Sequence, residues 1–170
     1  MTRRDSSATM RPGSWDSGNR WEFRMDPSQA VRDEIADLSR GDLEAVLSYY
    51  ADDVYFEDTS VPTPCRTKSE MRDFMKVFFD AFPDLRIEIR NVFSSSPSPS
   101  GGGQGGGYVT AEYDLLGTMR GEFLGHPPTG RGFRIKAVSI YEHNGTLFTK
   151  ETVYYDSASL FSQIGVMREP

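Results

Sequence analysis

Two carboxylates stand where the alternation of a strand would place them beside aromatic side chains. Asp58 follows Phe56 in alternation, and Asp156 follows Phe148 and Tyr154 at even spacing along the last predicted strand. A carboxyl group partly removed from water by aromatic rings has a raised pKa, so it can both take a proton and return it. Such a group can act as a general acid or a general base.

Each of these carboxylates also has a purely structural interpretation. Asp156 is followed by Ser157-Ala158-Ser159 and can cap a closing helix, since aspartate is a preferred N-cap residue. Asp58 precedes Thr59-Ser60 and can serve in a turn. The residues alone leave both interpretations open, and a cap and a catalytic role are compatible.

Other kinds of site have little support. Cys65 is the single cysteine, which excludes an internal disulfide and a thiolate zinc cluster. The two histidines, His126 and His143, lack the spacing of metal ligands, so we expect no metal site. The glycine-rich segment 94–107 is not followed by Lys-Ser/Thr or a helix start, which argues against a phosphate-binding loop.

Composition limits the partners and the compartment. The chain has 170 residues and a formal charge of −6, so it has no general attraction for nucleic acid or anionic membranes. No apolar run approaches the ~18–20 residues that span a bilayer. The lone thiol and the lack of an apolar signal segment predict a cytoplasmic protein.

The elements that must position these residues follow an α+β order. Segments 1–25 and 94–107 are polar and lack periodicity, so we expect a disordered extension and a flexible insert in an enlarged hairpin, with one domain over residues 26–170. Helical periodicity and caps predict helices over residues 27–40, 42–50, 68–82 and 157–164. Alternation predicts a short strand over residues 54–58 and four further strands over residues 85–93, 108–119, 131–143 and 146–156. This pattern predicts a curved antiparallel sheet with helices on one face.

Longer motifs carry a family resemblance. The segments GTMRGEFLGHPPTGRGF (117–133) and ETVYYDSASLFSQIG (151–165) resemble the SnoaL-like polyketide cyclases of the NTF2-like superfamily. The upstream segments GDLEAVLSYYADDVYFEDTS (41–60) and FFDAFPDLRIEI (78–89) are similar to the first half of the same family. The resemblance covers about residues 26–166 and implies a cone-shaped α+β fold around a pocket.

The resemblance also implies a chemistry. Members of the enzyme branch close a ring by intramolecular aldol condensation without a cofactor, and an aspartate near the end of the last strand acts as acid and base. The matching residue is Asp156. Many relatives carry a histidine in the loop motif where this chain has Met119, so the chain departs from the pattern there. We expect the substrate to contact six residues: Tyr154, Phe148, Asp58, Phe56, Phe123 and Met119.

Relatives pair through the outer side of the sheet, so we expect a homodimer or larger homo-oligomer.

We therefore expect the protein to be a cofactor-independent cyclase or isomerase that acts on a small hydrophobic, polyketide-like carbonyl compound. Two alternatives remain, because this fold also occurs in domains without catalysis. One is a non-catalytic small-molecule-binding or dimerisation domain. The other is a related epoxide hydrolase or hydratase, which would need several pocket carboxylates supported by arginine or asparagine.

Overall fold

The structure is a computed structural model, and it describes residues 26–95 and 106–167. The predicted extension 1–25 and most of the predicted insert 94–107 lie outside the described residues. Among the described residues, no helix combines the length and the apolar character that a membrane span requires.

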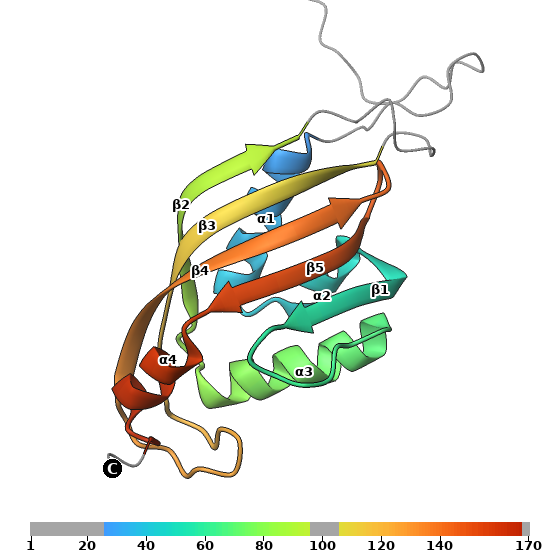
Figure 1. The fold of residues 1–170 in the computed structure, drawn as a ribbon. Helices are drawn as coiled ribbons and strands as arrows, with labels where there is room; N and C mark the ends of the chain where they lie inside the picture. The colour runs from blue at the N-terminus through green and yellow to red at the C-terminus, as the bar shows by residue number, and fades with distance from the viewer. Residues whose placement is uncertain (1–25, 96–105, 168–170) are drawn as a thin grey trace, which may run out of the picture.

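The predicted α+β class is confirmed, and the elements follow the expected order (Figure 1). In chain order they are α1 (Pro27–Ser39), α2 (Leu43–Ser48), β1 (Tyr50–Asp58), α3 (Lys68–Ala81), β2 (Arg86–Ser94), β3 (Gly107–Thr118), β4 (Gly132–His143), β5 (Phe148–Tyr155) and α4 (Ser157–Ile164).

Side-chain caps fix where the first three helices begin. Asp26 accepts a hydrogen bond from the Ser28 amide at α1, and Asp42 accepts one from the Ala45 amide at α2. The Thr67 hydroxyl accepts from the Glu70 amide at α3. These contacts satisfy amide groups that have no partner within the helix, so the predicted helix starts are confirmed.

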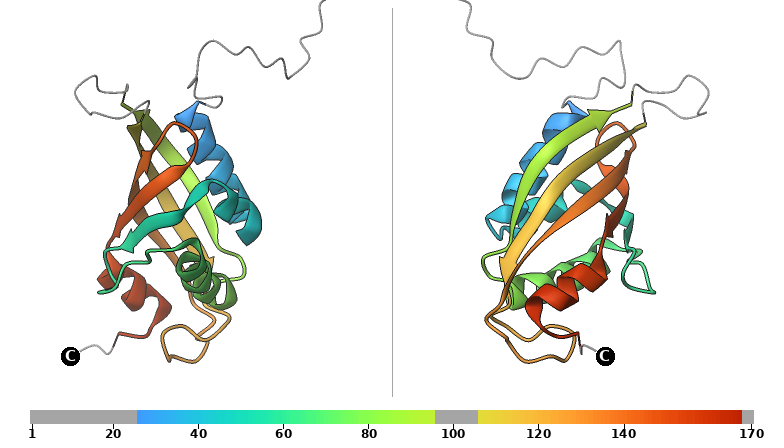
Figure 2. Two further views of the ribbon diagram at one scale, coloured as in Figure 1. Left: turned by 90° about the vertical axis from the view of Figure 1, so that its right-hand side faces the viewer. Right: turned by 60° about the vertical axis from the view of Figure 1, so that its left-hand side comes forward.

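The five strands form one sheet in the order β1-β5-β4-β3-β2. All neighbours are antiparallel except β1 and β5, which run parallel, so the wholly antiparallel sheet that we expected is wrong at this edge. Strand β1 is also longer than the predicted 54–58, because it begins at Tyr50 and contains an irregularity between Tyr50 and Tyr55. The sheet is curved, and α1 and α3 lie on the same side of it (Figure 2).

Two hydrophobic clusters fill the interior. The larger one joins α1, α2 and α3 to the inner face of the sheet, around Val31, Tyr50 and Tyr141. The second cluster lies at the far end of the sheet, where α4 and the 119–131 segment meet the end of α3, around Phe82 and Leu160. Between the sheet and the two long helices the packing is incomplete, and this gap contains the candidate site.

Candidate active site

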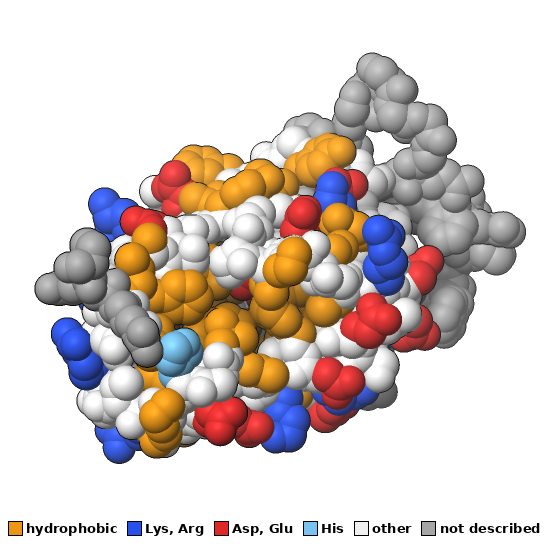
Figure 3. Space-filling view, turned by 60° about the horizontal axis from the view of Figure 1, so that its bottom comes forward, with side chains coloured by type: hydrophobic (Ala, Val, Ile, Leu, Met, Phe, Trp, Pro, Cys, Tyr) orange, Lys and Arg blue, Asp and Glu red, His pale blue; other side chains and the backbone are white. Residues whose placement is uncertain are grey.

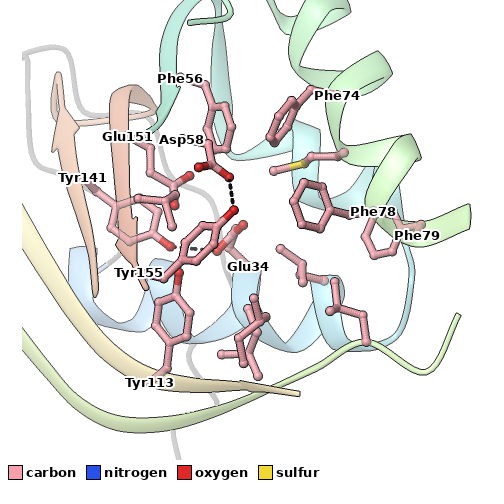
Figure 4. Close-up of a pocket in the computed structure, with 16 residues that line it drawn as sticks. Glu34, Phe56, Asp58, Phe74, Phe78, Phe79, Tyr113, Tyr141, Glu151 and Tyr155 are labelled. Carbon is pink, nitrogen blue, oxygen red and sulfur yellow. Dashed lines mark hydrogen bonds between the residues drawn. The ribbon is translucent and has the colours of Figure 1, made fainter. Parts of the chain in front are cut away.

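A cavity of about 90 Å³ lies between the concave face of the sheet, α1 and α3 (Figure 4). Most of its lining is apolar and comes from Leu, Ile, Val, Met and Phe side chains of α1, α3, β1, β2, β3 and β5, together with Leu85 between α3 and β2. The polar lining side chains are three carboxylates and three tyrosines, namely Glu34, Asp58, Glu151, Tyr113, Tyr141 and Tyr155. On the face shown in Figure 3, hydrophobic side chains gather around a hollow and charged side chains lie toward the edges.

Alternation along β1 and helical spacing along α3 build one wall of this cavity. Phe56 and Asp58 both point inward from β1, as their spacing predicted. On α3, Phe74 and Phe78 lie one turn apart, and the Phe74 ring centroid is 5.3 Å from that of Phe56. The carboxyl group of Asp58 therefore lies beside an aromatic wall.

Asp58 is held in one orientation by neighbouring donors. Its side chain is only 6% exposed. One oxygen accepts hydrogen bonds from the Ser60 amide at 2.8 Å and the Ser60 hydroxyl at 2.7 Å, and the other accepts from the Tyr155 hydroxyl at 3.0 Å. Burial and the charge of Asp58 raise the pKa of Tyr155, so its hydroxyl stays a donor. Lone pairs of the carboxylate remain available to a bound molecule.

Glu34 and Glu151 are the two carboxyl groups of the lining that sequence reasoning missed. Both are almost completely buried, and burial is the main reason why the pKa of each is raised. Glu34 lies on the face of α1 that carries Val31 and Leu38, so its position within the apolar stripe was a usable signal. No comparable signal marked Glu151, because it lies on the strand face that we expected to point outward.

An extra residue in β5 explains this error. Glu142 of β4 pairs with Lys150 of β5, whereas the next residue of β4, His143, pairs with Phe148. An advance of one residue along β4 therefore corresponds to two residues along β5. Such a bulge moves the following side chains to the opposite faces of the sheet. The cavity is consequently lined by Glu151, Val153 and Tyr155.

Phe148 and Tyr154, which we predicted to contact the substrate, therefore do not line the cavity. Phe148 is buried in the core, where its ring contacts those of Tyr50 and Tyr141, and it does not line the cavity. Tyr154 is 48% exposed on the outer face of the sheet.

Asp156 lies outside the cavity as well. Its side chain is exposed and accepts a hydrogen bond from the Ser159 amide at 3.0 Å, as the N-cap of α4. The expectation that it lies in a partly apolar cavity is wrong, because β5 ends at Tyr155 and the chain turns into the helix at Asp156.

Met119 and Phe123 are buried, but in the second hydrophobic cluster rather than in the cavity lining. Strand β3 ends at Thr118, and the following segment leaves the sheet to pack against the end of α3. There the Phe123 ring contacts those of Phe78 and Phe82, at centroid distances of 5.1 and 4.9 Å. Both residues therefore pack in the core and do not line the cavity where we expected them to contact the substrate.

Cationic side chains are absent from the lining within the described ranges 26–95 and 106–167. The main ion-pair group lies on the outer face of the sheet instead. There Asp114 accepts hydrogen bonds from Arg90 and Arg134, which hold the pKa of Asp114 at about 2.

In the described part of the chain, His, Cys, Asp and Glu side chains do not form a group of three or more that could hold a metal ion.

Solved structures with similar folds are distant in sequence. TsrD from Streptomyces laurentii is 19% identical, with a TM-score of 0.67, and the match covers 85% of this chain and 100% of that one. IdmH from Streptomyces antibioticus, proposed to be a polyketide cyclase, is 21% identical, with a TM-score of 0.66 and coverage of 84% and 100%. A Catenulispora acidiphila protein with a ketosteroid isomerase-like fold, solved with trimethylamine, is 15% identical, with a TM-score of 0.66 and coverage of 86% and 100%.

These neighbours show that the fold is the NTF2-like one that the sequence predicted. No protein of curated function matches the sequence. The profile of the SnoaL-like polyketide cyclases matches residues 29–164, which includes every described helix and strand except the first two residues of α1. The chain therefore belongs to the SnoaL-like polyketide cyclase family.

Proposed function

We propose that the protein is a cofactor-independent cyclase or isomerase that uses acid–base chemistry on a small carbonyl compound, with Asp58 as the base. One observation carries this proposal: an apolar cavity in which the polar lining groups are carboxyl and phenol groups. Such groups exchange protons with carbon acids and donate hydrogen bonds to oxygen, whereas anionic substrates would call for cations. Membership of the cyclase family supports the same reaction class.

In this mechanism Asp58 removes a proton from a carbon next to the carbonyl group. The electron pair left on that carbon is delocalised onto the carbonyl oxygen, giving an enolate. In a cyclase, the enolate carbon then attacks a second carbonyl carbon of the same molecule and closes the ring. The π bond of that carbonyl breaks, and its oxygen, now an alkoxide, takes up a proton, so that the product is an isomer of the substrate. The fixed orientation of Asp58 contributes, because a base must lie within hydrogen-bond reach of the proton that it takes.

The cavity also suggests what the substrate is like. Its walls favour an uncharged, largely apolar molecule, and a polyketide-like carbonyl compound has this character. A volume of about 90 Å³ accommodates several water molecules or a small ring. A small cyclic ketone is therefore a suitable probe.

The experiment measures deuterium exchange into cyclohexanone at the carbons next to its carbonyl, in D₂O, by NMR. We expect the wild-type protein to accelerate exchange well beyond an equal concentration of acetate. Asp58→Asn should reduce that acceleration by at least ~10²-fold, the usual lower range for losing a general base. Asparagine keeps the shape of the side chain but cannot take the proton.

Asp53→Asn is the matched control, because Asp53 is an exposed aspartate on the same strand. It should exchange deuterium as the wild type does. Equal exchange by wild type and Asp58→Asn, with both proteins folded by circular dichroism, would overturn the role of Asp58. It would leave a non-catalytic binding domain as the better interpretation.

A further inference from the structure

Three buried side chains from three different elements meet at the wall of the cavity. The Tyr50 hydroxyl, at the start of β1, lies 2.5 Å from a carboxyl oxygen of Glu151 on β5. The same hydroxyl lies 3.3 Å from a carboxyl oxygen of Glu34 on α1. Tyr50 therefore bridges two carboxyl groups that both line the cavity.

The number of protons in this cluster follows from the bridge. A tyrosine hydroxyl has one hydrogen and can donate only one of the two contacts. If the other contact is also a hydrogen bond, the carboxyl group must donate it, so that carboxyl group carries a proton. Two adjacent buried carboxylates would also repel each other strongly in the low dielectric of the interior.

The neighbours indicate which carboxyl group is protonated. The shorter contact, 2.5 Å, is typical of a hydroxyl that donates to an ionised oxygen, which assigns the Tyr50 hydrogen to Glu151. The nearby hydroxyl groups of Tyr50, Ser139 and Tyr141 partly offset the rise that burial causes in the pKa of Glu151. This leaves the proton on Glu34, whose two carboxyl oxygens each lie 3.3 Å from a hydroxyl, one from that of Tyr50 and the other from that of Tyr141.

We propose, building on the function proposed above, that Glu34, Tyr50 and Glu151 share one proton and act as the acid of the site. Asp58 takes the proton from the substrate carbon, and the cluster gives its proton to the substrate oxygen as negative charge develops there. Asp58 then loses its proton to water at the cavity mouth, and the cluster takes one back. The substrate is isomerised, and no net proton is consumed.

The bridge also connects the two carboxyl groups as a relay. If Glu34 passes its proton to the Tyr50 oxygen while Tyr50 passes its hydrogen to Glu151, the proton moves from one carboxyl group to the other without crossing the cavity. The acid can therefore act from either of two positions on the wall. This arrangement would suit a reaction in which the oxygen to be protonated changes as the ring closes.

A spectroscopic experiment tests the shared proton without any substrate. Infrared spectroscopy separates the C=O stretch of a protonated carboxyl group from the bands of carboxylates. At pH 7 we expect this stretch in the wild type and in Asp58→Asn, and we expect its loss in Glu34→Gln. In Glu151→Gln the band should titrate at lower pH than in the wild type, because the neighbouring charge is gone.

Three results would overturn the shared proton. The first is a wild-type protein without a protonated carboxyl band at pH 7. The second is a band that survives Glu34→Gln, and the third is a band that titrates at the same pH in Glu151→Gln as in the wild type. Because these measurements use no substrate, they remain decisive even if cyclohexanone exchange disproves the role of Asp58.

The acid role is tested by deuterium exchange with the same variants. Glu34→Gln can keep the hydrogen bonds to Tyr50 and Tyr141 but has no acidic proton, so the maximal exchange rate should fall at least ~10²-fold with little change in KM. Tyr50→Phe removes the bridge and should also slow exchange, whereas Tyr55→Phe, on the same strand outside the lining, should not. Wild-type rates in a folded Glu34→Gln protein would overturn the acid role.

Discussion

Glu34 and Asp58 line the same cavity, but their surroundings suit opposite roles. Glu34 is buried among hydroxyl groups and a second carboxyl group, and its pKa is raised well above the ordinary value. Asp58 is hydrogen-bonded by the Ser60 amide and by the hydroxyl groups of Ser60 and Tyr155. Two carboxyl groups in different environments can thus serve as proton donor and proton acceptor in one site.

The raised pKa of Glu34 predicts how stability depends on pH. The folded protein binds this proton more tightly than the unfolded chain does, so it holds more protons above pH ~4.5. The free energy of unfolding should therefore fall as pH rises from ~4.5 toward the folded pKa, by up to ~1.4 kcal/mol per pH unit. Glu34→Gln has no such proton, so its stability relative to the wild type should increase with pH.

Urea denaturation at several pH values between about 5 and 8 measures this difference. Asp33→Asn, the neighbouring position on α1, serves as the control and should follow the wild-type curve. Parallel pH profiles for wild type and Glu34→Gln would contradict the prediction. Comparing the variants isolates Glu34 from the other ionisable groups that interact with it, which are Glu151, Tyr50, Tyr141 and Asp37.

The sequence could predict the half of the site that local periodicity controls. Phe56 and Asp58 line the cavity because β1 alternates regularly over its last residues. Glu34 was missed although its helical spacing marks it, because a charged residue on an amphipathic helix is ordinarily assigned to the solvent side. Its burial depends on partners from β1 and β4, Tyr50 and Tyr141, which no local pattern connects to α1.

At the scale of elements, α4 tests what Asp156 does. Asparagine caps helices about as well as aspartate, whereas alanine does not. We therefore expect Asp156→Asn to leave stability nearly unchanged and Asp156→Ala to reduce it by ~1 kcal/mol. Both should exchange deuterium into cyclohexanone at the wild-type rate, because Asp156 lies outside the cavity. Thermal melts and the exchange assay on these proteins check both expectations.

The family resemblance implies the opposite result for activity. If Asp156 were the acid and base, Asp156→Asn would abolish exchange while the fold survived. That outcome would require the end of β5 and the start of α4 to rearrange when substrate binds. It would therefore contradict the arrangement described here.

Element boundaries followed well from the sequence, but the faces of the last strand did not. Pro27, Thr67 and Gly165 marked helix ends through local backbone chemistry. The bulge that reverses the faces of β5 depends instead on its pairing with β4, where Phe148 lies opposite His143. A one-residue shift in pairing has no signature in composition, yet it exchanges every inward side chain for an outward one.

At the scale of the whole molecule, the outer face of the sheet predicts self-association. Ile140 and Tyr154 are exposed there beside threonines of the neighbouring strands, and Phe93 and Tyr108 are exposed toward one end. Such side chains favour burial against a second copy. One chain has a mass of 19.1 kDa, and we expect light scattering at micromolar concentration to give at least twice that mass.

Ile140→Lys should shift the protein toward the monomer, because it would bury a charge at the pair interface. Lys136→Gln is the matched control, since it changes the same strand and face near the ion pairs of Asp114. A wild-type protein with the mass of a single chain would refute the expected homo-oligomer. An Ile140→Lys variant that keeps the wild-type mass would place the interface elsewhere.

The parallel pairing of β1 with β5 also determines when the site can form during folding. Tyr50 and Glu151 are 101 positions apart, and Asp58 pairs with Val153. Contacts of such large sequence separation pay a large loop-closure cost and tend to form late. A chain still missing β5 can assemble the β2–β3–β4 hairpins but holds neither a closed cavity nor the shared proton. During synthesis, therefore, activity should appear only after the last strand has docked.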